Sequence, residues 1–189
     1  MITADSRATA PAPYAWLRPT ALTASSLLFG YGILRLLDGL DGHRDKSGWP
    51  WRAGHTLFLL GIVLFAVLIV RLRRLLLATS PRQRVLTDGA TVAGLVGAAA
   101  FCWVILGDLF PRFAEAVSTP DPVLVAGPAL FELGLLTLLV RAAVARLLPV
   151  WSPVLVLVGF VAIAADLDLL PVGAALVFGG LLPVRRPAP

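Results

Sequence analysis

The sequence predicts an all-α fold, a polytopic bundle of six transmembrane helices, and three observations support this prediction. Hydrophobic residues make up 58% of the 189 residues, charged residues make up only 14%, and the mean hydropathy is +0.87. The apolar residues fall into blocks close to the length of about 20 residues that a membrane helix needs. The Arg residues gather at alternate ends of these blocks, which is typical of cytoplasmic loops. Because a soluble domain is about 45–50% apolar and about 25% charged, the composition excludes a soluble, disordered, fibrous or nucleic-acid-binding protein.

Four apolar blocks predict the first four spans, over residues 19–40, 53–70, 89–110 and 123–140. Pro19 suits the first turn of the first helix, where its missing N–H is not needed. Pro111 ends the third span. Pro128 lies in the first turn and a half of the fourth span and allows a small kink there.

The last apolar block covers residues 151–183 and is too long for one ordinary span. As a single helix it would be about 50 Å long, against a hydrocarbon core of about 30 Å. Asp166 and Asp168 lie at its centre and Pro171 follows them. The block therefore predicts a hairpin, with a fifth span over residues 152–165 and a sixth over 171–182. One long tilted helix, which gives five spans in total, is the alternative.

The positive charges favour six spans with both termini in the cytoplasm. With the N-terminus inside, six spans put eleven basic residues on the inner side and four on the outer side, whereas five spans give nine against six. We therefore expect a disordered cytoplasmic N-terminus (residues 1–18), a six-helix domain (19–184) and a cytoplasmic tail (185–189). The preference for Arg over Lys, with many Ala, Gly, Pro and Val, is what GC-rich codons supply, so we expect a bacterial plasma membrane.

One further segment resembles a known group of proteins. The fifth span is preceded by Arg146-Leu147-Leu148-Pro149-Val150-Trp151 and contains Gly159, and Gly54-His55 opens the second span. These features resemble a broad group of uncharacterised six-span integral membrane proteins of high-GC Gram-positive bacteria. The resemblance implies six spans with both termini inside the cell, and it implies no particular activity or site residue.

Glu132 is the most informative single residue, because it lies near the middle of the fourth span. A carboxylate at that depth costs a few kcal/mol, so we expect Glu132 to face the bundle and to have a partner or a proton. The expected partner is Arg35, in the outer third of the first span. The pair is either a proton or ion site, or a structural contact that holds the bundle together.

A collar of polar residues is predicted at the outer face. Both histidines lie in it, and acids together with imidazoles suit Zn²⁺ or Mn²⁺, but no paired spacing defines a metal site. Asp166 and Asp168 would serve equally well as caps of the sixth helix. The collar consists of Asp38, Asp41, His43, His55, Asp108, Asp166 and Asp168.

Two other patterns concern lipids and packing. The inner loop after the second span is basic. It attracts anionic lipid headgroups, at about 1 kcal/mol per residue, or binds a cytosolic partner, or only determines topology. Its arginines are Arg71, Arg73, Arg74, Arg82 and Arg84. Small residues at four-residue spacing predict close packing of the third and sixth spans, which we expect within the bundle, with packing between subunits as the alternative. They are Ala90, Gly94 and Ala98 in the third span and Ala175 and Gly179 in the sixth.

The sequence leaves three functions open. The chain contains no catalytic, phosphate-binding or cofactor motif, so we expect neither a cofactor nor a metal. The favoured function is a small accessory or interaction protein without chemistry of its own, associated with a membrane-protein partner. The alternatives are a small transporter or ion-coupled carrier that uses Glu132 and Arg35, and a membrane enzyme at the outer interface.

Overall fold

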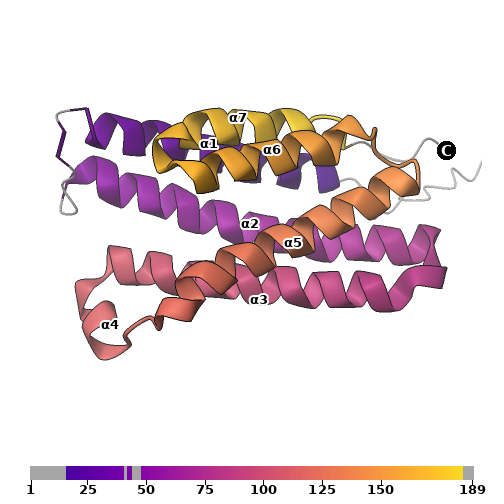
Figure 1. Cartoon of the computed structure of the whole chain (residues 1–189), viewed down its shortest axis with the longest axis horizontal. Helices are drawn as coiled ribbons and strands as arrows, with labels where there is room; N and C mark the ends of the chain where they lie inside the picture. Colours follow the sequence, from indigo (N-terminus) through magenta and orange to yellow (C-terminus); the bar gives the residue numbers. More distant parts are fainter. Residues whose placement is uncertain (1–15, 41, 44–47, 185–189) are drawn as a thin grey trace, which may run out of the picture.

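The protein is helical throughout the part of the chain that the structure describes. The structure is a computed structural model and describes residues 16–40, 42–43 and 48–184. It contains α1 (Leu17–Asp38), α2 (Trp49–Thr79), η1 (Pro81–Gln83), α3 (Arg84–Leu109), α4 (Pro111–Ala116), α5 (Asp121–Val144), α6 (Trp151–Ala165), η2 (Leu167–Leu169) and α7 (Leu170–Leu181) (Figure 1). The all-α prediction is confirmed. The predicted tail, almost all of the predicted disordered N-terminus, and Asp41 lie outside the described residues.

Four helices in the described ranges are long and apolar enough to cross a membrane. They are α1, α2, the segment Pro81–Leu109 that includes α3, and α5. By contrast, α6 has 15 residues and α7 has 12, which correspond to about 22 Å and 18 Å. The structure therefore contains four candidate spans and an additional pair of shorter apolar helices.

The last apolar block folds as the predicted hairpin, and the single long helix is wrong. The chain turns at Asp166, whose backbone is extended and whose Oδ1 atom accepts a hydrogen bond from the backbone N–H of Asp168 at 2.8 Å. Asp166 thus caps η2, which leads directly into α7. The beginning of α7 packs closely against Gly32 of α1, where an added Cβ would lie 2.7 Å from the Leu170 side chain.

Two segments differ from the prediction. The second helix continues nine residues beyond the expected end at Val70, because Leu72, Leu75 and Leu76 extend its buried face. The predicted basic loop is therefore helical apart from the short η1 connection, and long Arg side chains tolerate this because their aliphatic stems can lie along apolar surface. Residues 111–116 form α4, where a loop was expected, and Pro111 begins that helix in its favoured position.

Glycines allow α3 and α5 to pack with their backbones in contact. A Cβ on Gly97 would overlap the backbone nitrogen of Phe131, and a Cβ on Gly134 would overlap the backbone of Gly94. Ala90 and Ala98 lie buried on the same helix. Packing by the small residues of the third span is thus confirmed within the bundle.

The α6–α7 hairpin uses a similar contact but not the predicted residues. Gly159 and Gly173 face each other, each with its missing Cβ position 2.5 Å from the other's carbonyl oxygen. The Ser152 hydroxyl donates a hydrogen bond to the carbonyl of Gly180. Ala175 is exposed, and a Cβ on Gly179 would meet nothing closer than 3.9 Å. Ala175 and Gly179 therefore do not form this contact, because the face of α7 that meets α6 carries Gly173 and Gly180.

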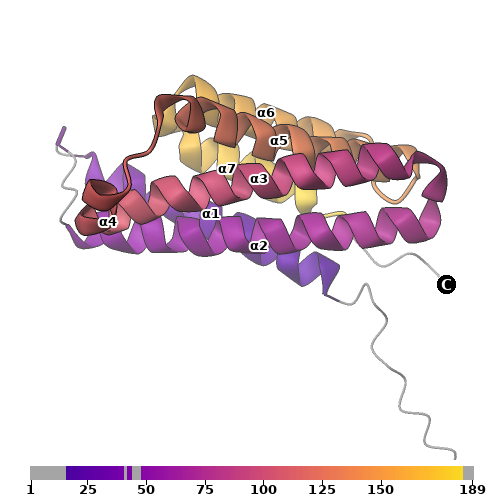
Figure 2. The same ribbon diagram turned by 90° about the horizontal axis from the view of Figure 1, so that it is seen from below.

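The arrangement has two ends, which we name the η1 end and the α4 end after the elements that lie there. α1 packs against α2 and against α7, α6 packs on α7, and α5 crosses α3 diagonally (Figures 1 and 2). α5 and α6 are joined at the η1 end by residues 145–150 and diverge toward the α4 end (Figure 1). Leu17 and Val184 line one small space together with Leu148, so both ends of the described chain lie at the η1 end.

We predict that Gly97→Ala separates α3 from α5 and lowers the free energy of unfolding by about 1–3 kcal/mol, because the new methyl group overlaps the α5 backbone. Equilibrium unfolding in detergent, followed by circular dichroism, measures this change. Gly89→Ala on the same helix is the matched control, since no atom lies within 4 Å of the added Cβ and Ala favours a helix by up to about 1 kcal/mol. Equal stability of both variants would contradict the backbone contact.

Candidate functional site

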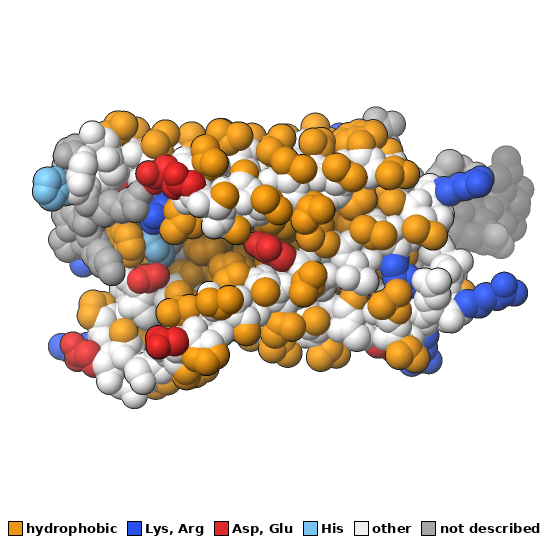
Figure 3. Space-filling model, viewed as in Figure 1, with side chains coloured by type: hydrophobic (Ala, Val, Ile, Leu, Met, Phe, Trp, Pro, Cys, Tyr) orange, Lys and Arg blue, Asp and Glu red, His pale blue; other side chains and the backbone are white. Residues whose placement is uncertain are grey.

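A cavity of about 400 Å³ opens where α5 diverges from α6. Every long helix contributes to its wall, and Figure 3 shows the hollow on this face of the molecule, with an acidic side chain among apolar ones. The volume lies within the range of about 300–1,000 Å³ that is typical of small-molecule sites. The lining residues are Leu28, Tyr31, Phe58, Ile62, Phe65, Phe101, Pro128, Phe131, Glu132, Phe160, Ile163, Ala164, Leu167 and Leu170.

Aromatic rings form a continuous chain along the cavity wall. Tyr31 and Phe58 stack with ring centroids 4.6 Å apart, and Phe58 meets Phe101 edge-on at 5.5 Å. Phe131 then contacts Phe101, Phe65 and Phe160 at 5.5–6.0 Å, always edge to face. Such pairs contribute about 0.5–1.5 kcal/mol each beyond burial, so the wall is a packed structure rather than a loose surface.

Glu132 is the one charged residue among the described residues of this wall. It lies at the centre of α5, next to Phe131, and is half-buried. Within the described part of the chain it has no hydrogen-bond or ion-pair partner. The carboxyl group therefore faces the cavity and makes no hydrogen bond or ion pair with the described residues.

The structure does not bring Glu132 and Arg35 together. Arg35 lies in the last turn of α1, and its buried Nε atom has no hydrogen-bond partner among the described residues. It lies near enough to His55 to interact with it electrostatically. No hydrogen bond or ion pair in the described structure joins Arg35 to Glu132, so the predicted pair stays a hypothesis.

Part of the predicted polar collar forms a cluster at the α4 end. His55 is 4% exposed, and its Nδ1 atom donates a hydrogen bond to the Trp51 carbonyl at 2.9 Å. Its Nε2 atom lies 3.7 Å from Oδ2 of Asp108. The Trp51 indole donates to the Asp108 carbonyl at 3.3 Å, and Tyr31 packs edge-on against the imidazole. The cluster thus joins α1, α2 and α3 just beyond the aromatic wall.

Of the other described collar residues, Asp38 lies near enough to His55 to interact with it electrostatically, and the rest lie apart from this cluster. His43 is exposed, and Asp38 is half-buried at the end of α1. Asp166 and Asp168 are exposed at the hairpin turn, where Asp166 acts as a cap. Within the described ranges, no three His, Cys, Asp or Glu side chains are grouped so that they could hold a metal ion.

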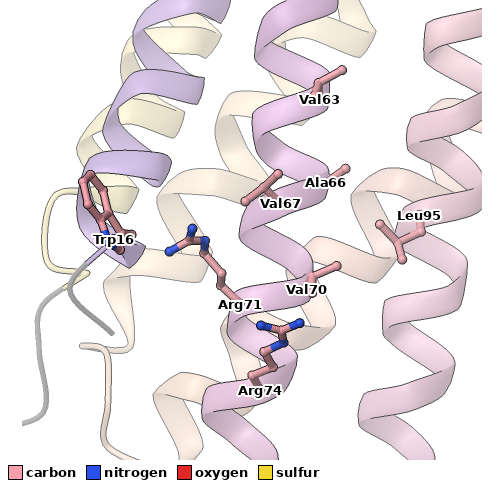
Figure 4. Close-up of a pocket in the computed structure, with 8 residues that line it drawn as sticks. All are labelled: Trp16, Val63, Ala66, Val67, Val70, Arg71, Arg74 and Leu95. Atoms are coloured by element: carbon pink, nitrogen blue, oxygen red, sulfur yellow. The ribbon is translucent and has the colours of Figure 1, made fainter. Parts of the chain in front are cut away.

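The arginines at the η1 end fall into different environments. Arg73 and Arg84 both pair with Asp88, at 2.7 Å and 3.4 Å. Arg82 is exposed. Arg71 and Arg74 line a separate groove beside Trp16 (Figure 4). The blue side chains in Figure 3 lie mainly at this end, and most of the red ones lie toward the α4 end.

Arg141 is a buried residue whose role the sequence does not reveal. It is 6% exposed at the end of α5, and its Nε atom donates to the Gln83 side-chain oxygen at 3.0 Å. Its Nη1 atom donates to the Gln83 carbonyl at 3.2 Å. Arg141 therefore holds the η1 connection against α5. In the sequence it is only one more basic residue beside a span, because its acceptor is 58 residues away along the chain.

Comparisons with protein-family models, with curated proteins and with solved structures give no match. The resemblance to six-span membrane proteins therefore stays a prediction, and the function has to be argued from the geometry of the site.

We predict that Glu132→Leu raises the free energy of unfolding by about 2 kcal/mol, because it removes an unpartnered carboxyl group from an apolar wall. Glu132→Gln should give a smaller rise. Equilibrium unfolding in detergent measures both variants. The control is Glu115→Leu on exposed α4, for which we expect a change within about 0.5 kcal/mol. A loss of stability on Glu132→Leu would mean that the carboxyl group has a structural partner.

Proposed function

We propose that this chain is a small membrane carrier that binds an organic cation with an apolar body beside Glu132. One observation carries the proposal: a carboxyl group without a partner among the described residues faces a cavity of about 400 Å³. An ionised group in apolar surroundings is costly unless an opposite charge compensates it. A bound cation would supply that charge.

The chemistry of the wall supports this class of ligand. Six aromatic side chains line the cavity, and the faces of aromatic rings attract cations. The remaining lining residues are apolar and suit an apolar body on the same molecule. Since Arg35 lies with the His55 cluster rather than at the cavity, we assign ligand binding to Glu132 without Arg35.

The accessory or interaction protein is the competing hypothesis, and it assigns no ligand to Glu132. The two hypotheses therefore predict different effects of a substitution at Glu132. In a carrier the substitution removes ligand binding, whereas in an accessory protein it leaves the complex with the partner intact. The third hypothesis, an enzyme at the outer interface, finds less support, since among the described residues only part of the collar is clustered and no three of its side chains are grouped to hold a metal ion.

We also propose that the chain crosses a bacterial plasma membrane six times with both termini in the cytoplasm. The antiparallel α6–α7 hairpin and the position of Leu17 and Val184 at one end support an even number of crossings. The arginines at the η1 end support placing that end on the cytoplasmic side.

We predict that the protein in lipid nanodiscs binds benzyltrimethylammonium at one site, and that Glu132→Gln weakens this binding at least ten-fold. The variant retains the shape of the side chain and removes its charge. Equilibrium binding of the radiolabelled cation, with empty nanodiscs as background, measures the affinity. Glu115→Gln, which removes an exposed charge on α4, should leave the affinity unchanged.

The uncharged isostere neopentylbenzene separates charge recognition from apolar partitioning. We expect it to bind the native protein and the Glu132→Gln variant equally. Equal affinity of the cation for both proteins would overturn the proposed function. A second polypeptide at fixed stoichiometry in native mass spectrometry, retained by Glu132→Gln, would then favour the accessory protein.

We predict that Asp168→Cys, in a Cys102→Ala background, is labelled by a membrane-impermeant maleimide in intact cells, because a sixth span requires the hairpin turn to reach the outer side. Ser118→Cys, in the exposed α4–α5 connection, is the positive control. Arg82→Cys in η1 should be labelled only after permeabilisation. Protection of the Asp168→Cys variant from outside would mean that the hairpin enters and leaves on the inner side, leaving four spans.

A further inference from the structure

A second groove, of about 730 Å³, lies on the outward face of α2 at the η1 end. It is bounded by Trp16 at the start of α1 and by α3 on the other side (Figure 4). Along its floor, α2 contributes Val63, Val67 and Val70, followed by Arg71 and Arg74. These positions share one face of a helix, so the groove is apolar along most of its length and cationic at one end.

Charge distinguishes these two arginines from their neighbours. Arg73 and Arg84 share the carboxylate of Asp88, to which both are bonded. Arg71 and Arg74 have no ion-pair partner among the described residues. Their guanidinium groups lie at the mouth of the groove, with that of Arg71 directed toward Trp16 (Figure 4). The groove therefore presents two uncompensated positive charges at its end.

The groove extends over most of one leaflet of a membrane. From Val63 to Arg71 the helix rises about 12 Å, and half of a hydrocarbon core is about 15 Å. Trp16 is 61% exposed beside the arginines, and indole rings favour the membrane–water interface. Apolar residues thus extend over the depth of an acyl chain, and the cations lie at the depth of its headgroup.

We propose that this groove binds one phospholipid whose headgroup carries a net negative charge. The phosphate is held by Arg71 and Arg74, and an acyl chain lies along residues 63–70 of α2. A planar guanidinium binds phosphate oxygens with two parallel hydrogen bonds, which gives the site its preference. The site is separate from the Glu132 cavity, with which it shares no lining residue.

Native mass spectrometry of the delipidated full chain, titrated with palmitoyl-oleoyl-phosphatidylglycerol, tests the proposal. We expect one lipid to bind more tightly than those that follow, and more tightly than phosphatidylcholine with the same chains. Arg71→Gln/Arg74→Gln should weaken the first binding step about thirty-fold, which corresponds to about 1 kcal/mol for each basic residue. Arg71→Lys/Arg74→Lys retains both charges and should restore binding to within about five-fold.

Two further variants distinguish a defined lipid site from a general electrostatic attraction between basic residues and anionic lipid. Arg82→Gln/Arg146→Gln removes the same number of charges from exposed positions at the same end, and it should change the first step less than three-fold. Val67→Trp fills the groove without altering the charge, and it should weaken the first lipid-binding step about ten-fold. The proposal is wrong if the control double variant loses as much affinity as Arg71→Gln/Arg74→Gln. It is also wrong if Val67→Trp binds normally, or if a second copy of the chain displaces the lipid.

Discussion

The close contact between α3 and α5 determines where the cavity and its carboxyl group lie. Gly94, Gly97 and Gly134 let the two backbones touch, so α5 can cross α3 in only one place. Since α5 is joined to α6 only at the η1 end, this crossing carries the other half of α5 away from α6. Phe131 and Glu132, on the turn of α5 at the crossing, then face the space that is left. The cavity is thus the by-product of a packing constraint on another face of the same helix.

The features that the sequence predicted are those that depend on residues close together in the chain. Apolar blocks, a proline, or two acids in a hydrophobic run are local signals, and they located the helices and the hairpin turn. Glu132 was equally visible as a charge within a span. The residues that surround it were not visible, because depth along a helix does not specify which neighbours a residue meets. Arg141 and the aromatic wall were missed for the same reason, since their contacts join residues far apart in the chain.

Several charged residues of the bundle have a partner of opposite charge. Asp88 pairs with both Arg73 and Arg84, and Asp108 lies beside His55. The Arg73–Asp88 and His55–Asp108 contacts join α2 to α3, whereas the Arg84–Asp88 contact lies within α3. Glu132, Arg71 and Arg74 have no such contacts among the described residues, and all three line a cavity or groove. At both sites, charged side chains without an ion-pair partner thus line open space. This is the pattern expected of a ligand-binding site.

The unequal lengths of α2 and the α6–α7 hairpin have a consequence for the surrounding bilayer. The apolar part of α2, over residues 53–70, is about 27 Å long, whereas α6 has 15 residues, or about 22 Å, and the hairpin turns beside Gly32, six residues before α1 ends. Under the proposed threading, the hydrocarbon layer must be thinner beside the hairpin than beside α2. On this proposal, the surrounding membrane has a graded thickness and is thinnest on the side where the Glu132 cavity opens. Short-chain lipids should collect there, and water should approach the cavity more closely than in an undisturbed bilayer.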